Sequence, residues 1–181
     1  MHAAARFGSD VIMRKVKLSD LTDDLEISCE ETSSYVDLQT GEVVAVWDSS
    51  LREAEEGDEK AGEGLPDWRK KEFETARAIV ASFGDRFIPA PTMYDFHEYR
   101  HMERFIGTVE DDEAVEQLHR AIKGRGAFRH FKNTASRLGL LERWFAYREA
   151  ALKDFVRDWA RAQEIPLSED PPPKPGAAGD G

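Results

Sequence analysis

Cysteine is almost absent from this chain of 181 residues, since Cys29 is the only one. A single cysteine cannot form an internal disulfide, so nothing in the sequence is built for an oxidising compartment, and we expect a cytoplasmic protein. Long apolar runs are absent too. None approaches the roughly 20 residues that span a bilayer, and residues 1–15 lack the apolar core of a signal peptide. We therefore expect no membrane partner, while the sequence sets no oligomeric state.

Several signatures of catalysis are also missing. No Gly-x-Ser-x-Gly elbow marks a serine nucleophile, and Cys29 has neither a neighbouring histidine nor a Cys-x-x-Cys partner. No glycine-rich segment follows a strand and ends in the Lys-Ser/Thr of a phosphate loop. These absences predict no cofactor and favour a non-enzymatic protein.

Basic residues are outnumbered, with 25 lysines and arginines against 36 aspartates and glutamates, which gives a formal net charge of -11. This excess repels polyphosphate at long range and argues against a general nucleic-acid coat protein. Hydrophobic residues make up 40% of the chain, which is enough for a packed core and argues against global disorder. Any contact with an anion must therefore be local.

The ends of the chain differ in composition from its middle. Residues 1–15 are typical of a flexible extension, and residues 166–181, rich in proline and glycine, of a disordered tail. We expect a single α+β domain over residues 16–165. Within it, residues 48–64 carry seven carboxylates and few large apolar side chains, which predicts a solvated acidic loop.

Hydrophobic periodicity predicts a mostly helical α+β fold, with about five or six helices packed against a small antiparallel β-hairpin or three-stranded sheet. The hairpin strands are residues 34–38 and 43–47, joined by a turn at Gly41, and residues 86–88 are a candidate third strand. Helices are expected over residues 19–28, 66–83, 94–108, 111–122, 127–138 and 141–163.

Several motifs spread along the chain occur together in one known family. They are Lys17-Leu18-Ser19-Asp20-Leu21, the hairpin from Tyr35 to Val43, Arg86-Phe87-Ile88-Pro89, Glu98-Tyr99 with Met102-Glu103-Arg104-Phe105, the segment from Ala121 to Lys132, and Trp144-Phe145. With these motifs the chain resembles a bacterial family, the uncharacterised protein family 0158 of the UPF series, over roughly residues 16–165. The resemblance implies no established activity, cofactor or catalytic residue.

The sharpest chemical asymmetry is a segment without acidic residues, from 118 to 141, which carries six lysines and arginines. Its glycines let the backbone approach a ligand closely, and the helix that follows directs free N–H groups and a positive dipole end at an anion. The expected anion site consists of Lys123, Gly124, Arg125, Gly126, Arg129 and Lys132. Its partner would be a nucleic-acid phosphate or an acidic protein.

A structural interpretation of the same segment stays open. The cations can instead pair with the acidic residues 110–116 or 48–63 of the chain itself, and the two glycines can simply let one helix reverse into the next. Phe128 and Phe131, three positions apart, are expected to anchor the helix in the core.

A second motif has the pattern of a zinc hydrolase. His97-Glu98-Tyr99-Arg100-His101 matches H-E-x-x-H, in which two histidines one helical turn apart bind zinc and the glutamate acts as a general base. The third ligand of the extended motif is missing, and both histidines are expected on the solvated face of a helix. Coincidence is the simpler interpretation, so zinc remains only the alternative cofactor, with His97, Glu98 and His101 as the alternative metal site.

The sequence thus predicts a non-enzymatic binding or regulatory module that contacts an anionic partner through its basic helix entrance. One alternative is the zinc-dependent hydrolase, and another is a purely protein-binding domain that uses the acidic loop. Trp144, Phe145, Phe155 and Trp159 match a stacking platform for bases, but at helical spacing they are expected in the core.

Overall fold

The computed structural model describes residues 13–57, 64 and 66–169. Tertiary contacts divide the chain into two compact units. Unit 1 contains the described residues up to Ala90 and those from Trp159 onward, and unit 2 is the continuous stretch Pro91–Asp158. We expected a single domain over residues 16–165, and the described residues of that range fall into these two units.

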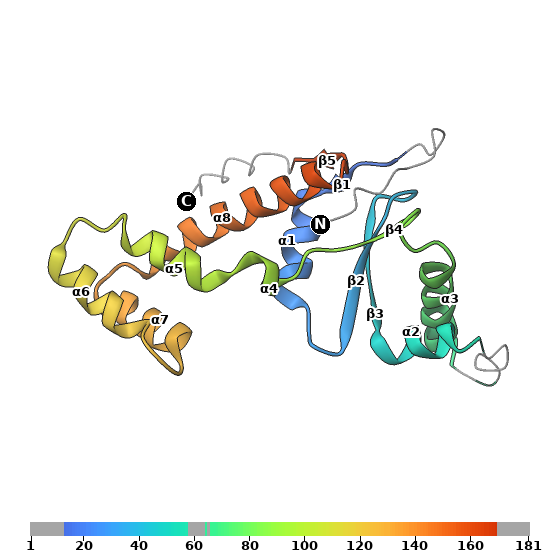
Figure 1. Ribbon diagram of the computed structural model, residues 1–181, viewed down its shortest axis with the longest axis horizontal. Coiled ribbons are helices and arrows are strands. Elements are labelled where there is room, and N and C mark those ends of the chain that lie inside the picture. Colours follow the sequence, from blue (N-terminus) through green and yellow to red (C-terminus); the bar gives the residue numbers. More distant parts are fainter. Residues whose placement is uncertain (1–12, 58–63, 65, 170–181) are drawn as a thin grey trace, which may run out of the picture. The chain divides into compact units, whose positions relative to one another are not determined.

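Unit 1 is built around a three-stranded antiparallel sheet (Figure 1) with the strand order β3-β2-β4. The strands are β2 (Thr32–Asp37), β3 (Glu42–Trp47) and β4 (Phe87–Pro89), close to the predicted ranges. Gly41 turns the chain between β2 and β3 with a φ of 76°. A Cβ there would lie 2.5 Å from the carbonyl oxygen of Lys15, so this turn requires glycine.

Among the described residues, three helices lie wholly within unit 1, namely α1 (Leu18–Ile27), α2 (Asp48–Glu55) and α3 (Asp67–Ala81). Helix α3 contributes Ile79 to a small buried cluster with Val46 of β3 and Phe87 of β4. The large apolar side chains near its two ends are not part of the core, since Trp68 and Phe83, which follows the helix, are 66% and 59% exposed. The buried positions of α3 are Phe73, Ala76 and Ile79, in its middle and C-terminal part.

Helix α2 corrects the predicted acidic loop over residues 48–64, because residues 48–55 are helical. Its charged face is solvated, while Ser50 is buried and donates a hydrogen bond from Oγ to Oε1 of Glu72 on α3 (2.9 Å). A contact so distant in sequence stabilises a helix that local composition does not favour. Residues 58–63 of that predicted loop lie outside the described residues.

The predicted chain ends also need correction, because a second, parallel sheet joins β1 (Val16–Lys17) to β5 (Leu167–Ser168). Val16 N donates to the carbonyl oxygen of Pro166 (3.0 Å). The start of the expected disordered tail over residues 166–181 is therefore a strand. Residues 1–12 of the expected extension over 1–15, and residues 170–181 of the tail, lie outside the described residues.

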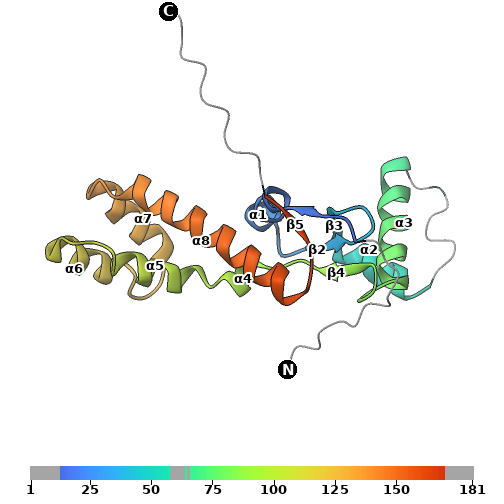
Figure 2. The ribbon, with the colours of Figure 1, turned by 90° about the horizontal axis from the view of Figure 1, so that it is seen from above.

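Unit 2 is helical throughout the elements assigned in it. Its helices are α4 (Met93–Phe96), α5 (Glu98–Ile106), α6 (Asp112–Ala121), α7 (Ala127–Arg137) and α8 (Leu141–Ala162), of which α8 continues into unit 1. Helices α4 and α5 run along α8, and α6 packs on α7 (Figure 2). The predicted class, a mostly helical α+β protein with a small antiparallel sheet, is confirmed.

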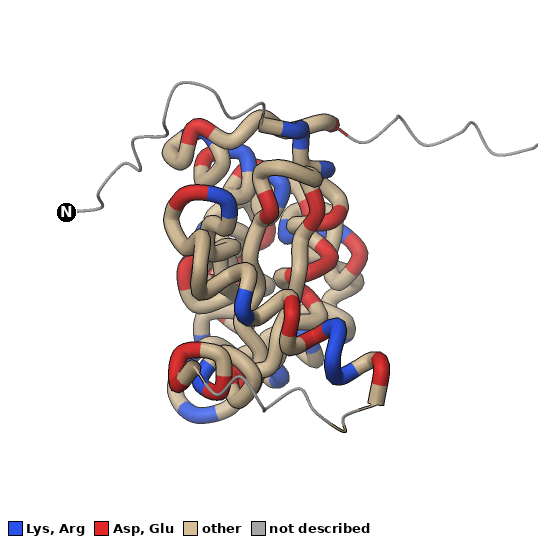
Figure 3. The backbone as a smooth tube through the Cα atoms, turned by 90° about the vertical axis from the view of Figure 1, so that its right-hand side faces the viewer, with Lys and Arg blue, Asp and Glu red and all other residues tan. Residues whose placement is uncertain are grey.

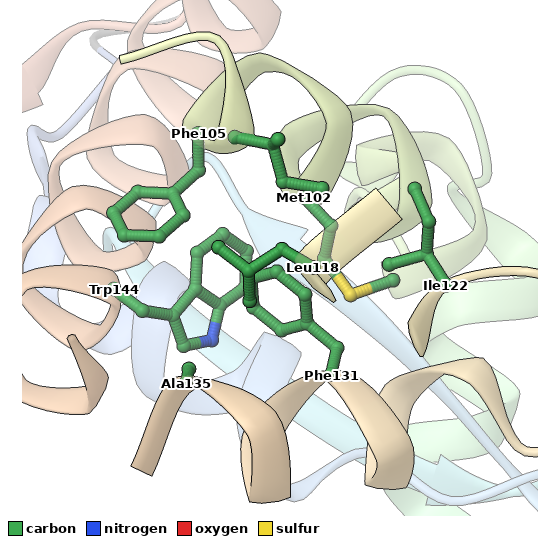
Figure 4. Close-up of a cluster of buried hydrophobic side chains, with 8 residues drawn as sticks. Met102, Phe105, Leu118, Ile122, Phe131, Ala135 and Trp144 are labelled. Carbon is green, nitrogen blue, oxygen red and sulfur yellow. The ribbon is translucent and has the colours of Figure 1, made fainter. Parts of the chain in front are cut away.

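Buried side chains from four helices form a hydrophobic core in unit 2 (Figure 4), and α5, α7 and α8 contribute its aromatic rings. The ring of Trp144 on α8 meets Phe131 of α7 and Phe105 of α5 edge to face, at centroid distances of 4.9 and 5.3 Å. Phe128 and Phe145, which we expected in this core, are instead 46% and 44% exposed. The core thus fixes which face of α7 points outward.

None of the helices in the described part of the chain combines the length and apolar character needed to cross a membrane.

Candidate functional site

The turn between α6 and α7 brings the basic segment into a fixed shape. Asp111 caps α6 by accepting a hydrogen bond from the backbone N–H of Glu113 (3.0 Å). Gly124 and Gly126 have φ values of 82° and 79°, in the left-handed region that glycine adopts without strain. They let the chain reverse within residues 122–126, so that α7 packs against α6.

A cleft of about 440 Å³ lies between these two helices, and we call it the α6–α7 cleft. Its lining consists of Gln117, Arg120, Ala121, Lys123, His130, Thr134 and Arg137. Four of the lining side chains are basic or become cationic on protonation, and no carboxylate is among them. These four side chains are exposed at the cleft, and such a set of donors without a carboxylate favours an anion.

Two contacts organise the cations of the α6–α7 cleft. Arg137 Nη2 donates to Gln117 Oε1 (3.3 Å), which links α7 to α6 across the cleft. Arg120 Nη2 lies 3.6 Å from Oε1 of Glu116, one turn earlier on α6. Both partners of this ion pair are exposed, and such a surface pair contributes only about 0–1 kcal/mol. Arg120 therefore remains able to exchange Glu116 for an external anion.

The six residues of the expected anion site are only partly brought together. Lys123 lines the α6–α7 cleft, and Gly124 and Gly126 shape the turn beside it. Arg125, Arg129 and Lys132 are exposed and do not line the cleft. Lys123 and these three residues form no ion pair with another described residue. Within the acid-free segment, the expected pairing with residues 110–116 is therefore found only at Arg120.

Sequence reasoning missed Arg120, His130 and Arg137 as members of one site. His130, Thr134 and Arg137 follow the spacing i, i+4, i+7 and share one face of α7. We expected Phe128 in the core, whereas the buried positions of α7 are Ala127, Phe131, Thr134 and Ala135. With these residues buried, α7 is rotated about its axis relative to our expectation, and His130 and Arg137 face α6. The helical spacing of Ala127, Phe131, Thr134 and Ala135 is the sequence signal that could have indicated this rotation.

The histidine motif has a different geometry from the one that the sequence predicts. His97 has a left-handed backbone with φ of 51° and separates α4 from α5, so the single helix expected over 94–108 is wrong. A capping box fixes the start of α4. Thr92 Oγ1 accepts from the N–H of Asp95, and Asp95 Oδ2 accepts from the N–H of Thr92 (3.0 Å). His97 therefore does not occupy the helical turn preceding His101.

The side chains of this motif have other partners. Glu98 Oε1 accepts from Nε of Arg148 on α8 at 2.6 Å. His101 stacks on Phe96 with ring centroids 4.2 Å apart, and its Nδ1 is buried with no hydrogen-bond partner among the described residues. Burial, followed by the nearby charge of Arg104, lowers the pKa of His101 below its ordinary value. A neutral ring fits this apolar stacked position.

Both histidines also line a second cleft of about 460 Å³ formed by α4, α5 and α8. Phe96, Phe155 and Tyr147 supply apolar surface there, while arginines and aspartates supply charges of both signs. Among the residues that the structure describes, no three His, Cys, Asp or Glu side chains are grouped so that they could hold a metal ion.

Comparison with known protein families matches part of the chain to a family profile. The profile of an uncharacterised protein family, UPF0158, covers residues 65–172. This range contains the elements from α3 to β5, including the α6–α7 turn. It begins at residue 65, whereas the resemblance described from the sequence motifs begins at about residue 16. Neither a curated protein nor a solved structure matches the chain. The chain belongs to the uncharacterised protein family UPF0158.

Proposed function

We propose that this protein is a binding module that holds an anionic partner at the α6–α7 cleft and at the glycine turn beside it. The observation that carries the proposal is the lining of the cleft, where Arg120, Lys123, His130 and Arg137 converge without a carboxylate. The rest of the chain is acidic enough to give a net charge of -11. A local reversal of sign on such a protein is the electrostatic signature of an anion site.

Phosphate groups suit this site better than isolated carboxylates. An arginine fork donates two parallel hydrogen bonds to a phosphate, and a lysine ammonium adds a compact point charge. Arg120 and Lys123 lie three positions apart at the end of α6, and Arg137 faces them from α7. Several phosphates on one backbone can engage these groups together, which favours a polyphosphate partner such as a nucleic acid.

Binding of three defined polyanions tests the proposal: duplex DNA, single-stranded RNA and polyglutamate. The variant Lys123→Glu/Arg137→Glu reverses two charges in the cleft, and Lys70→Glu/Lys71→Glu makes the same change on exposed positions of α3. We expect the cleft variant to lose at least about tenfold in affinity for each polyanion that the wild type binds. The α3 variant should lose less than threefold, through long-range repulsion alone.

Circular dichroism and thermal melting establish that both variants are folded. Equal losses in the two variants would show that net charge, and not the cleft, controls binding. Failure of the wild-type chain to bind any of the three polyanions at about 0.1 M salt would also refute the proposed function.

A further inference from the structure

The outward face of α7 differs in chemistry from the cleft. Arg129, Lys132, Asn133 and Ser136 are all exposed and follow the spacing i, i+3, i+4, i+7, so they share one side of the helix. The opposite side is buried against the core through Phe131 and Ala135. None of the four exposed side chains forms a hydrogen bond or ion pair with another described residue. Helix α7 thus presents hydrogen-bonding groups to which no described residue is bonded.

We propose that α7 is a recognition helix that enters the major groove of duplex DNA, while Lys123, Arg120 and Arg137 hold the phosphates beside it. This inference rests on the proposed function, because the phosphate contacts position the helix. Two packed helices joined by a glycine-containing turn, the second with a polar outer face, are features shared with helix-turn-helix DNA-binding proteins. The turn of residues 122–126 is one or two residues longer than the usual one.

The composition of this face favours DNA over an acidic protein. Protein interfaces depend on central apolar or aromatic anchors, and the four outward positions of α7 carry none. Arginine and asparagine instead match the paired hydrogen-bonding groups of guanine and adenine in the major groove. Phe128 lies at the edge of the face, half exposed, where an aromatic ring can contact the methyl group of thymine.

The dimensions of the helix favour B-form DNA over duplex RNA. With 11 residues, α7 is about 16 Å long, and the major groove of B-DNA, about 12 Å wide, admits a helix of this kind. The major groove of an A-form duplex is too narrow for side chains to read the bases. His130 and Arg137 lie on the flank of α7 that faces α6, from which they reach the backbone and not the base edges.

The acidic remainder of the protein supports selective binding. A chain with a net charge of -11 gains little from undirected attraction to DNA, because most of its surface repels the phosphates. Affinity must then come from the small area where α6 and α7 carry their cations. Contacts between the outward face of α7 and base edges would make that affinity depend on sequence.

Enrichment from a library of duplex DNA with randomised central base pairs tests the inference. The full chain is used, and affinities are then measured by fluorescence anisotropy for the enriched duplex, a scrambled duplex, the enriched sequence as duplex RNA, and polyglutamate. We expect a defined enriched motif, tighter binding of the enriched duplex than of the other three, and little binding of duplex RNA.

Two pairs of variants separate base reading from phosphate contact. Arg129→Ala and Asn133→Ala should lose about tenfold or more for the enriched duplex, with less than a twofold change for the scrambled one. Lys123→Ala and Arg137→Ala should weaken both duplexes by the same factor. Lys70→Ala on α3 is the matched control and should change neither.

The outcomes distinguish this inference from the proposed function. Three results would overturn the recognition helix and leave the anion site intact. They are binding through the cleft without an enriched motif, a preference for RNA or polyglutamate over duplex DNA, and equal losses of affinity in all four variants of α7 and the cleft. Absence of binding to every polyanion removes both.

Discussion

At the scale of single residues, Arg86 and Asp37 form a bidentate ion pair in unit 1. Arg86 donates from Nη2 to Oδ2 of Asp37 (2.6 Å) and from Nε to Oδ1 (2.9 Å), and the backbone N–H of Gln39 also donates to Oδ1 (2.9 Å). Burial disfavours the carboxylate, but these hydrogen bonds outweigh it and lower the pKa of Asp37. The pair therefore stabilises the fold only while Asp37 is ionised.

Replacing Arg86 by alanine leaves the buried carboxylate without its charged partner. We expect Arg86→Ala to lower the free energy of unfolding by about 3 kcal/mol at neutral pH, measured by urea denaturation. Because the folded-state pKa of Asp37 is lowered, this contribution is present above the unfolded value of about 4 and disappears as the pH falls through the folded value. The difference between wild type and variant should therefore shrink in acid.

The matched control for this prediction is Arg77→Ala, at an exposed position of α3 that makes no ion pair with another described residue. It should change stability by less than about 0.5 kcal/mol. A penalty for Arg86→Ala that stays constant down to strongly acidic pH would show that packing, and not charge, explains the effect.

At the scale of the secondary structure elements, His97 ends one helix and begins the next. A non-glycine residue with φ of 51° is strained, and a β-branched residue tolerates this conformation worst. We expect His97→Gly to leave stability unchanged or raise it by up to about 0.5 kcal/mol, and His97→Val to lower it by more than about 1 kcal/mol. Urea denaturation of the two variants gives the comparison.

The same pair of variants bears on the zinc alternative. A structural or catalytic zinc bound through His97 would be lost in both variants, and its loss would destabilise His97→Gly as well. Stoichiometric zinc in untagged wild-type protein, together with destabilisation of His97→Gly, would contradict our view of this residue as a helix junction.

Much of the fold follows from local patterns, and the failures follow from contacts that are distant in sequence. The hairpin around Gly41 and the helix after Asp111 depend on neighbouring residues, and both were predicted close to their observed bounds. Helix α2 depends on Ser50 meeting Glu72, and β5 depends on β1 at the other end of the chain. No local periodicity encodes such partners.

The candidate site shows the same division. The glycine turn and its positive φ values were predictable, because glycines between two helical patterns require a reversal. The lining of the α6–α7 cleft was not predictable, because it depends on the rotation of α7 about its axis. That rotation is set by how Phe131 packs on Trp144 of α8.

At the scale of the whole molecule, acidic and basic residues are interspersed along the described chain (Figure 3), and the acid-free segment 118–141 is the exception. If the cleft cations contact phosphates, each contact releases a counterion and makes affinity dependent on salt. Three cations, Arg120, Lys123 and Arg137, predict a slope of about -3 or steeper in a plot of log affinity against log salt.

Fluorescence anisotropy with duplex DNA at several salt concentrations measures this slope and so tests the number of phosphate contacts. Lys123→Ala should reduce the slope by about one, while the control Lys70→Ala should leave it unchanged. A slope near zero would mean that the partner is held by uncharged contacts, and the cleft would then lose its assigned role.

The pairing of β1 with β5 also bears on the order in which the protein is made. Unit 2 is one uninterrupted stretch of sequence, whereas unit 1 needs Val16 at one end and Leu167 at the other. Ribosomes synthesise a chain from its N-terminus, and domains generally fold as units. All residues of unit 2 are therefore synthesised before Leu167. Strand β1 of unit 1 is made earlier, but it has no partner strand until β5 has been synthesised.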